Sequence, residues 1–78
     1  MRLTCVLFCL ENNSYIADHF FTTDNEWTGI VPFSKDFNDA LHFNDRTEAK
    51  EFLSMFEKEI KGESGFTKFT PREYEILE

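Results

Sequence analysis

The chain has 78 residues and a formal net charge of −7, with eight Lys and Arg against fifteen Asp and Glu. This length supports one small domain, residues 1–78, with a stability of several kcal/mol. No apolar run approaches the roughly 20 residues of a membrane span, and the N-terminal apolar stretch lacks a signal-peptide cleavage pattern. We therefore expect a cytoplasmic protein. Its acidic balance disfavours direct binding to nucleic acid or to an anionic membrane.

Residues 2–10 are expected to form a strand. Both of its faces are apolar, which is typical of a strand at the centre of a sheet. Cys5 and Cys9 would lie on one face, roughly 13 Å apart, because a strand rises about 3.3 Å per residue. That separation is too long for a disulfide, so we expect two reduced, buried thiols. A polar turn follows at residues 11–14, where Asn tolerates the positive φ of a tight hairpin.

Two further strands are predicted before the helix. The first covers residues 15–22, and its wetter side is expected to carry Ile16, Asp18 and Phe20. After a polar turn at residues 23–26, another strand runs over residues 27–32 and ends at Pro32, because proline cannot donate to a ladder. Residues 34–43 are expected to hold a polar connection, a turn of helix and a short extended piece.

One amphipathic helix is predicted over residues 46–61. Its apolar stripe follows the i, i+3, i+4 spacing of a 3.6-residue helix and consists of Ala49, Phe52, Leu53, Phe56 and Ile60. Asp45 is the expected N-cap, and Gly62 is the expected left-handed stop. Three members of the stripe are expected to be buried against the sheet: Phe52, Leu53 and Phe56. The outer face carries equal numbers of acids and bases and is expected to face water.

A last strand is predicted after Pro71, anchored by Tyr74, Ile76 and Leu77. The sum is an α+β, two-layer fold: a small antiparallel sheet of about four strands, with one main helix (about 46–61) packed on one face. Thirteen aromatic residues are many for this length. They indicate either an aromatic core or rings that face a partner.

No motif in the chain indicates catalysis. The three glycines do not have the spacing of a phosphate-binding loop. The soft metal ligands Cys5, Cys9, His19 and His42 lack the close C-x-x-C geometry of a zinc site. We therefore expect no enzymatic activity, no cofactor and no metal.

The acidic residues are concentrated in one segment. Residues 11–45 contain seven acids and one base, Lys35, so six of the seven net negative charges lie there. These acids can be ordinary turn and solubilising residues. They can also form a surface that docks onto a basic groove of another protein, with an aromatic anchor. On the second interpretation, the partner-binding residues are Asp18, Asp24, Glu26, Asp36, Asp39, Tyr15 and Trp27.

Four segments together resemble a pattern found in many short phage and mobile-element proteins. These are a hairpin with Tyr15 and Ile16, a DAxxF segment at residues 39–43, an EAxxFL helix at residues 48–53 and a final strand at residues 74–77. The resemblance implies a setting and transfers no site residues. Small acidic phage proteins include anti-CRISPR and anti-restriction inhibitors, and some of them mimic the charge of DNA.

The resulting hypothesis is a non-enzymatic phage inhibitor in the host cytoplasm. It would bind a host defence protein that processes nucleic acid, through an acidic, DNA-mimicking surface. The alternative is a generic small interaction or structural module, as a monomer or a homodimer, without an inhibitory role.

Overall fold

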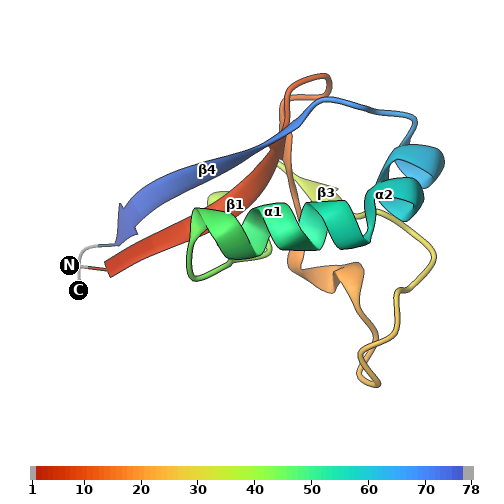
Figure 1. Cartoon of the computed structure of the whole chain (residues 1–78), viewed down its shortest axis with the longest axis horizontal. Coiled ribbons are helices and arrows are strands. Elements are labelled where there is room, and N and C mark those ends of the chain that lie inside the picture. The colour runs from red at the N-terminus through yellow and green to blue at the C-terminus, as the bar shows by residue number, and fades with distance from the viewer. Residues whose placement is uncertain (1, 77–78) are drawn as a thin grey trace.

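The computed structural model describes residues 2–76 and has an α+β architecture (Figure 1). The strands are β1 (Arg2–Cys9), β2 (Ser14–Ile16), β3 (Phe33–Ser34) and β4 (Phe69–Ile76). The helices are α1 (Arg46–Met55) and α2 (Glu57–Ser64), with two short 3-10 helices, η1 (Asp18–Phe20) and η2 (Phe37–Asp39). The predicted fold class is confirmed.

The described strands form one antiparallel sheet in the order β3-β2-β1-β4. β1 is central, as its two apolar faces predicted, and both of its cysteines are buried and free of a disulfide. The hairpin after it contains Asn13 at a φ of 58°, the positive value expected for a tight turn. The predicted anchor Leu77 lies outside the described residues.

A short segment, residues 40–43, fills the gap where β1 and β2 diverge. Its Phe43 exchanges two backbone hydrogen bonds with Cys5 of β1, at N···O distances of 2.9 and 2.7 Å. At its other end, the Leu41 N–H donates to the Ile16 carbonyl oxygen of β2 at 2.9 Å. The predicted short extended piece before the helix therefore completes the sheet.

β4 begins at Phe69 and includes Pro71, so the predicted start after Pro71 was too late. Cys5 directs its backbone groups toward Phe43, and its β4 partner Glu73 therefore belongs to a pair without hydrogen bonds. Pro71 lies two residues before Glu73 in β4, so its backbone groups also point away from β1. Its missing N–H thus falls on the free edge of the strand, where proline costs no ladder bond.

The predicted single helix is two helices that meet at Phe56, whose φ of −109° and ψ of 20° interrupt the helical backbone. Asp45 caps α1 as predicted, accepting the Glu48 N–H at 2.8 Å. Gly62 does not stop the helix, since α2 continues to Ser64 and Gly65 takes the left-handed conformation at a φ of 76°. The additional residues carry Glu63 to a backbone partner at Val31, which a helix ending at residue 61 would lose.

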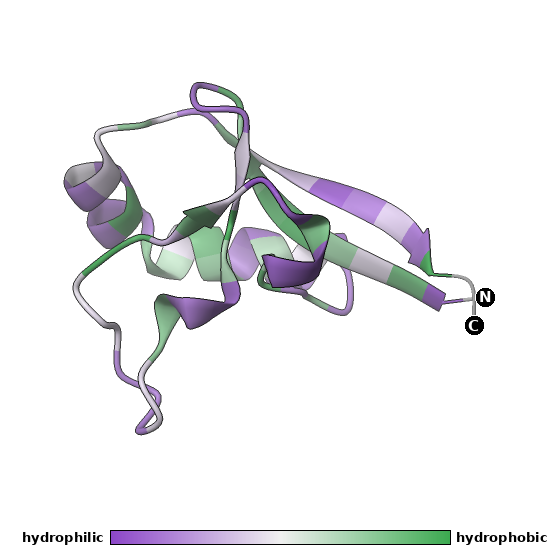
Figure 2. Cartoon of the chain, turned by 180° about the vertical axis from the view of Figure 1, so that it is seen from behind, coloured by the Kyte–Doolittle hydropathy of each residue, from purple (hydrophilic) through white to green (hydrophobic). Residues whose placement is uncertain are grey.

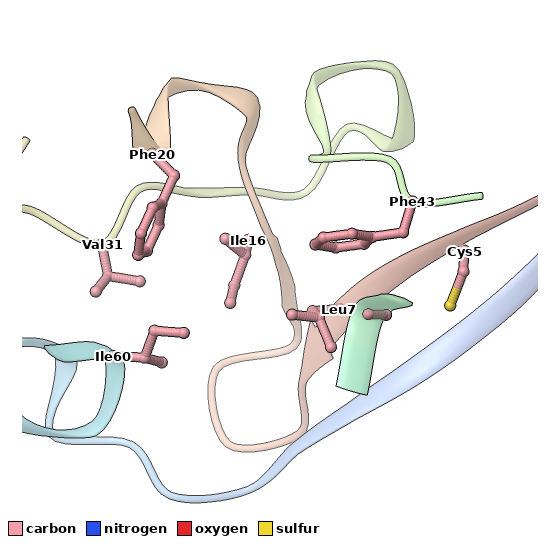
Figure 3. Close-up of a cluster of buried hydrophobic side chains, with 8 residues drawn as sticks. Cys5, Leu7, Ile16, Phe20, Val31, Phe43 and Ile60 are labelled. Carbon is pink, nitrogen blue, oxygen red and sulfur yellow. The ribbon is translucent and has the colours of Figure 1, made fainter. Parts of the chain in front are cut away.

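The core lies between the sheet and the helices (Figure 3). Its fully buried side chains come from β1, β2, η1 and both helices, and Figure 3 labels Phe20, Ile16, Leu7 and Ile60 among them. Phe20 is the aromatic centre, with ring centroids of Phe52 and Phe56 at 5.0 and 5.3 Å. The predicted stripe does face the sheet. However, Phe52, Leu53 and Phe56 are only partly buried, whereas Ala49 and Ile60 are fully buried.

Of the predicted strand at residues 15–22, only Tyr15 and Ile16 form a strand, and the predicted strand at residues 27–32 is not formed. β2 ends at Ile16, and the chain then turns through η1 and returns to the sheet at β3. Ile16 and Phe20 are fully buried, so the expected wetter side is in fact core. The reason is that Asp18 lies in the 3-10 turn, where it no longer shares a strand face with Ile16 and turns to solvent.

Candidate protein-binding surface

Residues 21–30 form a loop, here called the acidic finger, that projects from the lower side of the molecule in Figure 1. An isolated bridge between Phe21 and Trp27 closes it. Within the loop, the Thr22 hydroxyl oxygen accepts the N–H groups of Asp24 and Glu26 at 3.3 and 3.2 Å. Thr22 also donates its own N–H to the Glu26 carbonyl oxygen at 2.7 Å. The tip is therefore an ordered turn.

The base of the acidic finger is anchored by its tryptophan. The Trp27 ring stacks on Phe20 with a centroid distance of 6.1 Å, and its indole N–H donates to the Ile30 carbonyl oxygen at 3.2 Å. The Thr28 hydroxyl donates to the same oxygen at 3.2 Å. Gly29 allows this tight return because its φ is 87°. Trp27 is thus half-buried, and its polar group is satisfied within the loop.

Three of the predicted site residues carry exposed carboxylates in or next to the acidic finger: Asp18, Asp24 and Glu26. Within residues 2–76, no ion pair involves them and no hydrogen bond uses their side chains. Unpaired charges of one sign on an ordered loop produce a field that favours a cationic partner. Figure 2 shows the same tip as hydrophilic, in contrast to the apolar middle of the sheet.

The other acids of residues 11–45 have local structural roles. Asp36 caps η2 by accepting the Asn38 N–H at 2.9 Å, and Asp39 accepts the Ser34 hydroxyl at 3.3 Å. Glu11 accepts the N–H groups of Thr67 and Lys68 at 2.6 and 2.7 Å, joining the β1–β2 hairpin to the start of β4. These two donors, Lys68 first, lower the pKa of the Glu11 carboxyl. The acids of residues 11–45 therefore differ in whether their carboxylates have a hydrogen-bond partner.

Tyr15 lies on the sheet face opposite the helices. Its ring packs edge-on against Phe8 and Phe37, with centroid distances of 5.3 and 5.9 Å. The Tyr15 hydroxyl lies 3.3 Å from that of Tyr74, so the two rings bridge β2 and β4 across β1. This hydrogen bond, followed by burial, raises the pKa of Tyr15.

The structure therefore separates the seven predicted site residues into two groups. Near the acidic finger lie Asp18, Asp24, Glu26 and Trp27. On or beside η2, which covers the opposite face of the sheet in Figure 2, lie Asp36, Asp39 and Tyr15. Only the first group combines charges that lack a partner with an ordered backbone.

Several contacts around these groups were not predicted. The Arg72 guanidinium lies 3.8 Å from the centroid of the Phe8 ring, and His42 Nδ1 lies 3.0 Å from the Thr4 hydroxyl. Directly after the finger, the Val31 N–H donates to Glu63 Oε2 at 2.9 Å. Each contact joins residues far apart in the chain, so no local sequence pattern indicates it.

Two hollows lie on the remaining described surface. A hollow of about 180 Å³ beside β1 is lined by Arg2, Leu3, Thr4, His42, Phe43 and Asn44. Ligand pockets usually measure about 300 to 1,000 Å³. A larger hollow, about 570 Å³, falls within this range and is lined at the helix break by Ser54, Met55, Glu57, Lys58, Glu59 and Lys61.

Neither a metal cluster nor a membrane-spanning helix is present in the described part of the chain. Across residues 2–76, no three His, Cys, Asp or Glu side chains are grouped so that they could hold a metal ion. No helix there combines the length and the apolar composition needed to cross a bilayer.

Comparisons with protein-family models, curated proteins and solved structures gave no match for this chain. No residue role is therefore transferred from a relative. The case for a functional surface rests on the geometry and charge of the acidic finger.

Proposed function

We propose that this protein acts by contact, docking its acidic finger onto a basic, nucleic-acid-binding surface of another protein. The observation that carries the proposal is the set of three exposed carboxylates without a partner, Asp18, Asp24 and Glu26, on or beside an ordered loop. Carboxylates presented in this way would take the place of phosphates before a groove rich in Lys and Arg.

The order of the loop supports this mode of binding. A loop already held in its bound conformation loses less conformational entropy on association than a mobile loop. The acidic finger also offers apolar area, because Ile30 is 62% exposed and the Trp27 ring is half-buried. Charge would then direct the encounter, and the apolar side chains would contribute to affinity.

Occupation of the groove would exclude nucleic acid from the partner. Inhibition of a host defence nuclease, of the anti-CRISPR or anti-restriction type, is the form of this function that the resemblance to small phage proteins favours. Inhibition of this kind requires no catalytic step by this chain.

The alternative of a homodimer receives less support from the sheet edges. An edge strand promotes self-association when it is long and offers free backbone donors. β3 is only two residues long. β4 has eight residues, but those whose backbone groups face its free edge include Pro71, Glu73 and Glu75, and proline has no N–H to donate. Antiparallel pairing of two β4 strands about Glu73 would also place like charges opposite one another.

The test is capture of partners from a host-cell lysate with the tagged protein, with and without competing double-stranded DNA. We expect captured proteins that bind DNA and are displaced by DNA and by about 0.5 M salt, which screens exposed charges. The variant D24K/E26K should lose them. A control with the same charge change elsewhere, E51K/E75K, should retain them. Equal capture by both variants would contradict the proposal.

A further inference from the structure

One long-range polar contact connects the acidic finger to the helices. The Val31 N–H, where the finger returns to the sheet, donates to Glu63 Oε2 in the last turn of α2 at 2.9 Å. The two residues are 32 positions apart, and Val31 itself is only 4% exposed. A buried N–H without a partner is costly, so this carboxylate satisfies a real requirement of the loop.

Glu63 is an unusual residue for its position. The C-terminal end of a helix carries partial negative charge, and a carboxylate there is unfavourable by a fraction of a kcal/mol. In α2, the base expected in the last turn is present as Lys61, and Glu63 follows it. A residue that departs from the local rule usually has a compensating contact, and here that contact is the N–H of Val31.

The position of this bond decides what it controls. The chain that leads from the acidic finger back to the sheet, residues 28–32, is hydrogen-bonded to the rest of the molecule at both of its ends. Thr28 N–H bonds to Phe20, and the Pro32 carbonyl oxygen accepts the Ala17 N–H. Between these two ties lie Gly29 and the exposed Ile30. Two contacts join this stretch to the helical layer: the Glu63 bond, and the buried Val31 side chain, which belongs to the same core cluster as Ile60. Figure 3 shows Val31 facing Ile60 across the core.

We propose that Glu63 is a positioning residue that sets the direction of the acidic finger relative to α2. It would do so by holding Val31, without itself contacting the partner. This inference rests on the proposed function for its biological meaning, but its physical content can be tested without a partner.

The first test is amide hydrogen exchange followed by NMR. In E63A, exchange at Val31 should become roughly tenfold faster, because a hydrogen bond to a charged group is lost. E63Q keeps an acceptor oxygen and should restore most of the protection. E59A, a control on the same helix, should leave Val31 unchanged. Exchange at β1 amides should stay the same in all three variants. This result would distinguish loss of the Glu63–Val31 hydrogen bond from general destabilisation.

The second test measures direction itself. Spin labels at N25C in the finger and K58C on α2 would report a distance distribution. Native Cys5 and Cys9 are fully buried, and burial raises the pKa of the Cys5 thiol, so labelling should favour the introduced cysteines. We expect a narrow distribution that broadens with E63A and narrows again with E63Q.

The two proposals fail in different ways. If Val31 exchange and the label distances are the same in E63A and the parent protein, Glu63 does not position the finger. If both change as expected but D24K/E26K captures the same proteins as the parent, then Glu63 does position the finger and the proposed binding function is wrong. When both hold, E63A should reduce capture by several-fold, and E63Q should recover it.

Discussion

The core and the acidic finger are ordered by different kinds of contact. In the core, Phe20 packs against Phe52 and Phe56, more than thirty positions away in the chain. In the finger, most bonds join residues at most four positions apart, such as Thr22 to Glu26, and its carboxylates remain in water. A loop can therefore be rigid without burying its charges. Substitutions in the two regions should therefore have different effects. Those in the core should reduce the stability of the fold, and those at the finger tip should alter binding.

The largest effect is expected for Phe20→Ala. Phe20 is fully buried and contacts four aromatic rings: Phe21, Trp27, Phe52 and Phe56. Its removal should cost about 3 to 5 kcal/mol of unfolding free energy, a large part of the stability of a domain this small. Urea unfolding followed by circular dichroism measures this cost. Leu10→Ala, at an apolar side chain that is 52% exposed, is the control and should cost much less. Similar losses in both variants would mean that Phe20 is not the centre of the core.

Two glycines, one within α2 and one directly after it, should respond to substitution by Ala with opposite signs. Gly65 has a positive φ, so Gly65→Ala should destabilise the protein by about 1 kcal/mol, although no atom lies within 4 Å of the added Cβ. Gly62 lies within the helix and has equal space, so Gly62→Ala should stabilise it by about 0.5 to 1 kcal/mol. Thermal unfolding of both variants tests where the helix ends. If Gly62→Ala were the destabilising change, the helix would end where the sequence pattern placed it.

A smaller, pH-dependent effect is expected at Glu11. Its pKa is lowered in the folded protein by the N–H groups of Lys68 and Thr67. A lowered folded-state pKa means that the contribution to stability is present above the unfolded pKa and is lost as pH falls through the folded pKa. Glu11→Gln should therefore lower the melting temperature at pH 7, and its difference from the parent protein should shrink on acidification. Glu51→Gln, at an exposed helix position, should show no such convergence. A pH-independent difference for Glu11→Gln would contradict the assignment.

The smallest effect on stability is expected at the finger tip. Asp24 and Glu26 are exposed, and their side chains make no hydrogen bond within residues 2–76. The double variant D24K/E26K should therefore unfold within about 0.5 kcal/mol of the parent protein while it loses partner capture. Denaturant unfolding of the protein used for capture checks this. A large loss of stability would mean that the carboxylates help to hold the loop, and the loss of capture could then no longer be assigned to charge.

The sequence alone determined the elements whose signals are local. A short run that is apolar on both faces identified β1, and the 3.6-residue stripe identified the face of the helices that packs on the sheet. The Asp45 cap and the turn at Asn13 also followed from short patterns, because the bonds and dihedral angles concerned lie within a few residues. The clustering of acids in residues 11–45 was visible for the same reason.

Only the tertiary structure decided which acids have hydrogen-bond partners within the described residues. Asp36 and Asp39 look like Asp24 and Glu26 in the sequence, but Asp36 accepts the Asn38 N–H of η2 and Asp39 accepts the Ser34 hydroxyl of β3. The sequence pattern also predicted one strand over residues 15–22. Burial of Phe20 under the helices favours a 3-10 turn there instead, and the finger emerges from that turn. Glu63, in the last turn of α2, likewise finds its hydrogen-bond partner at Val31, 32 positions away. Each outcome is set by contacts between residues distant in the chain, which residue spacing does not encode.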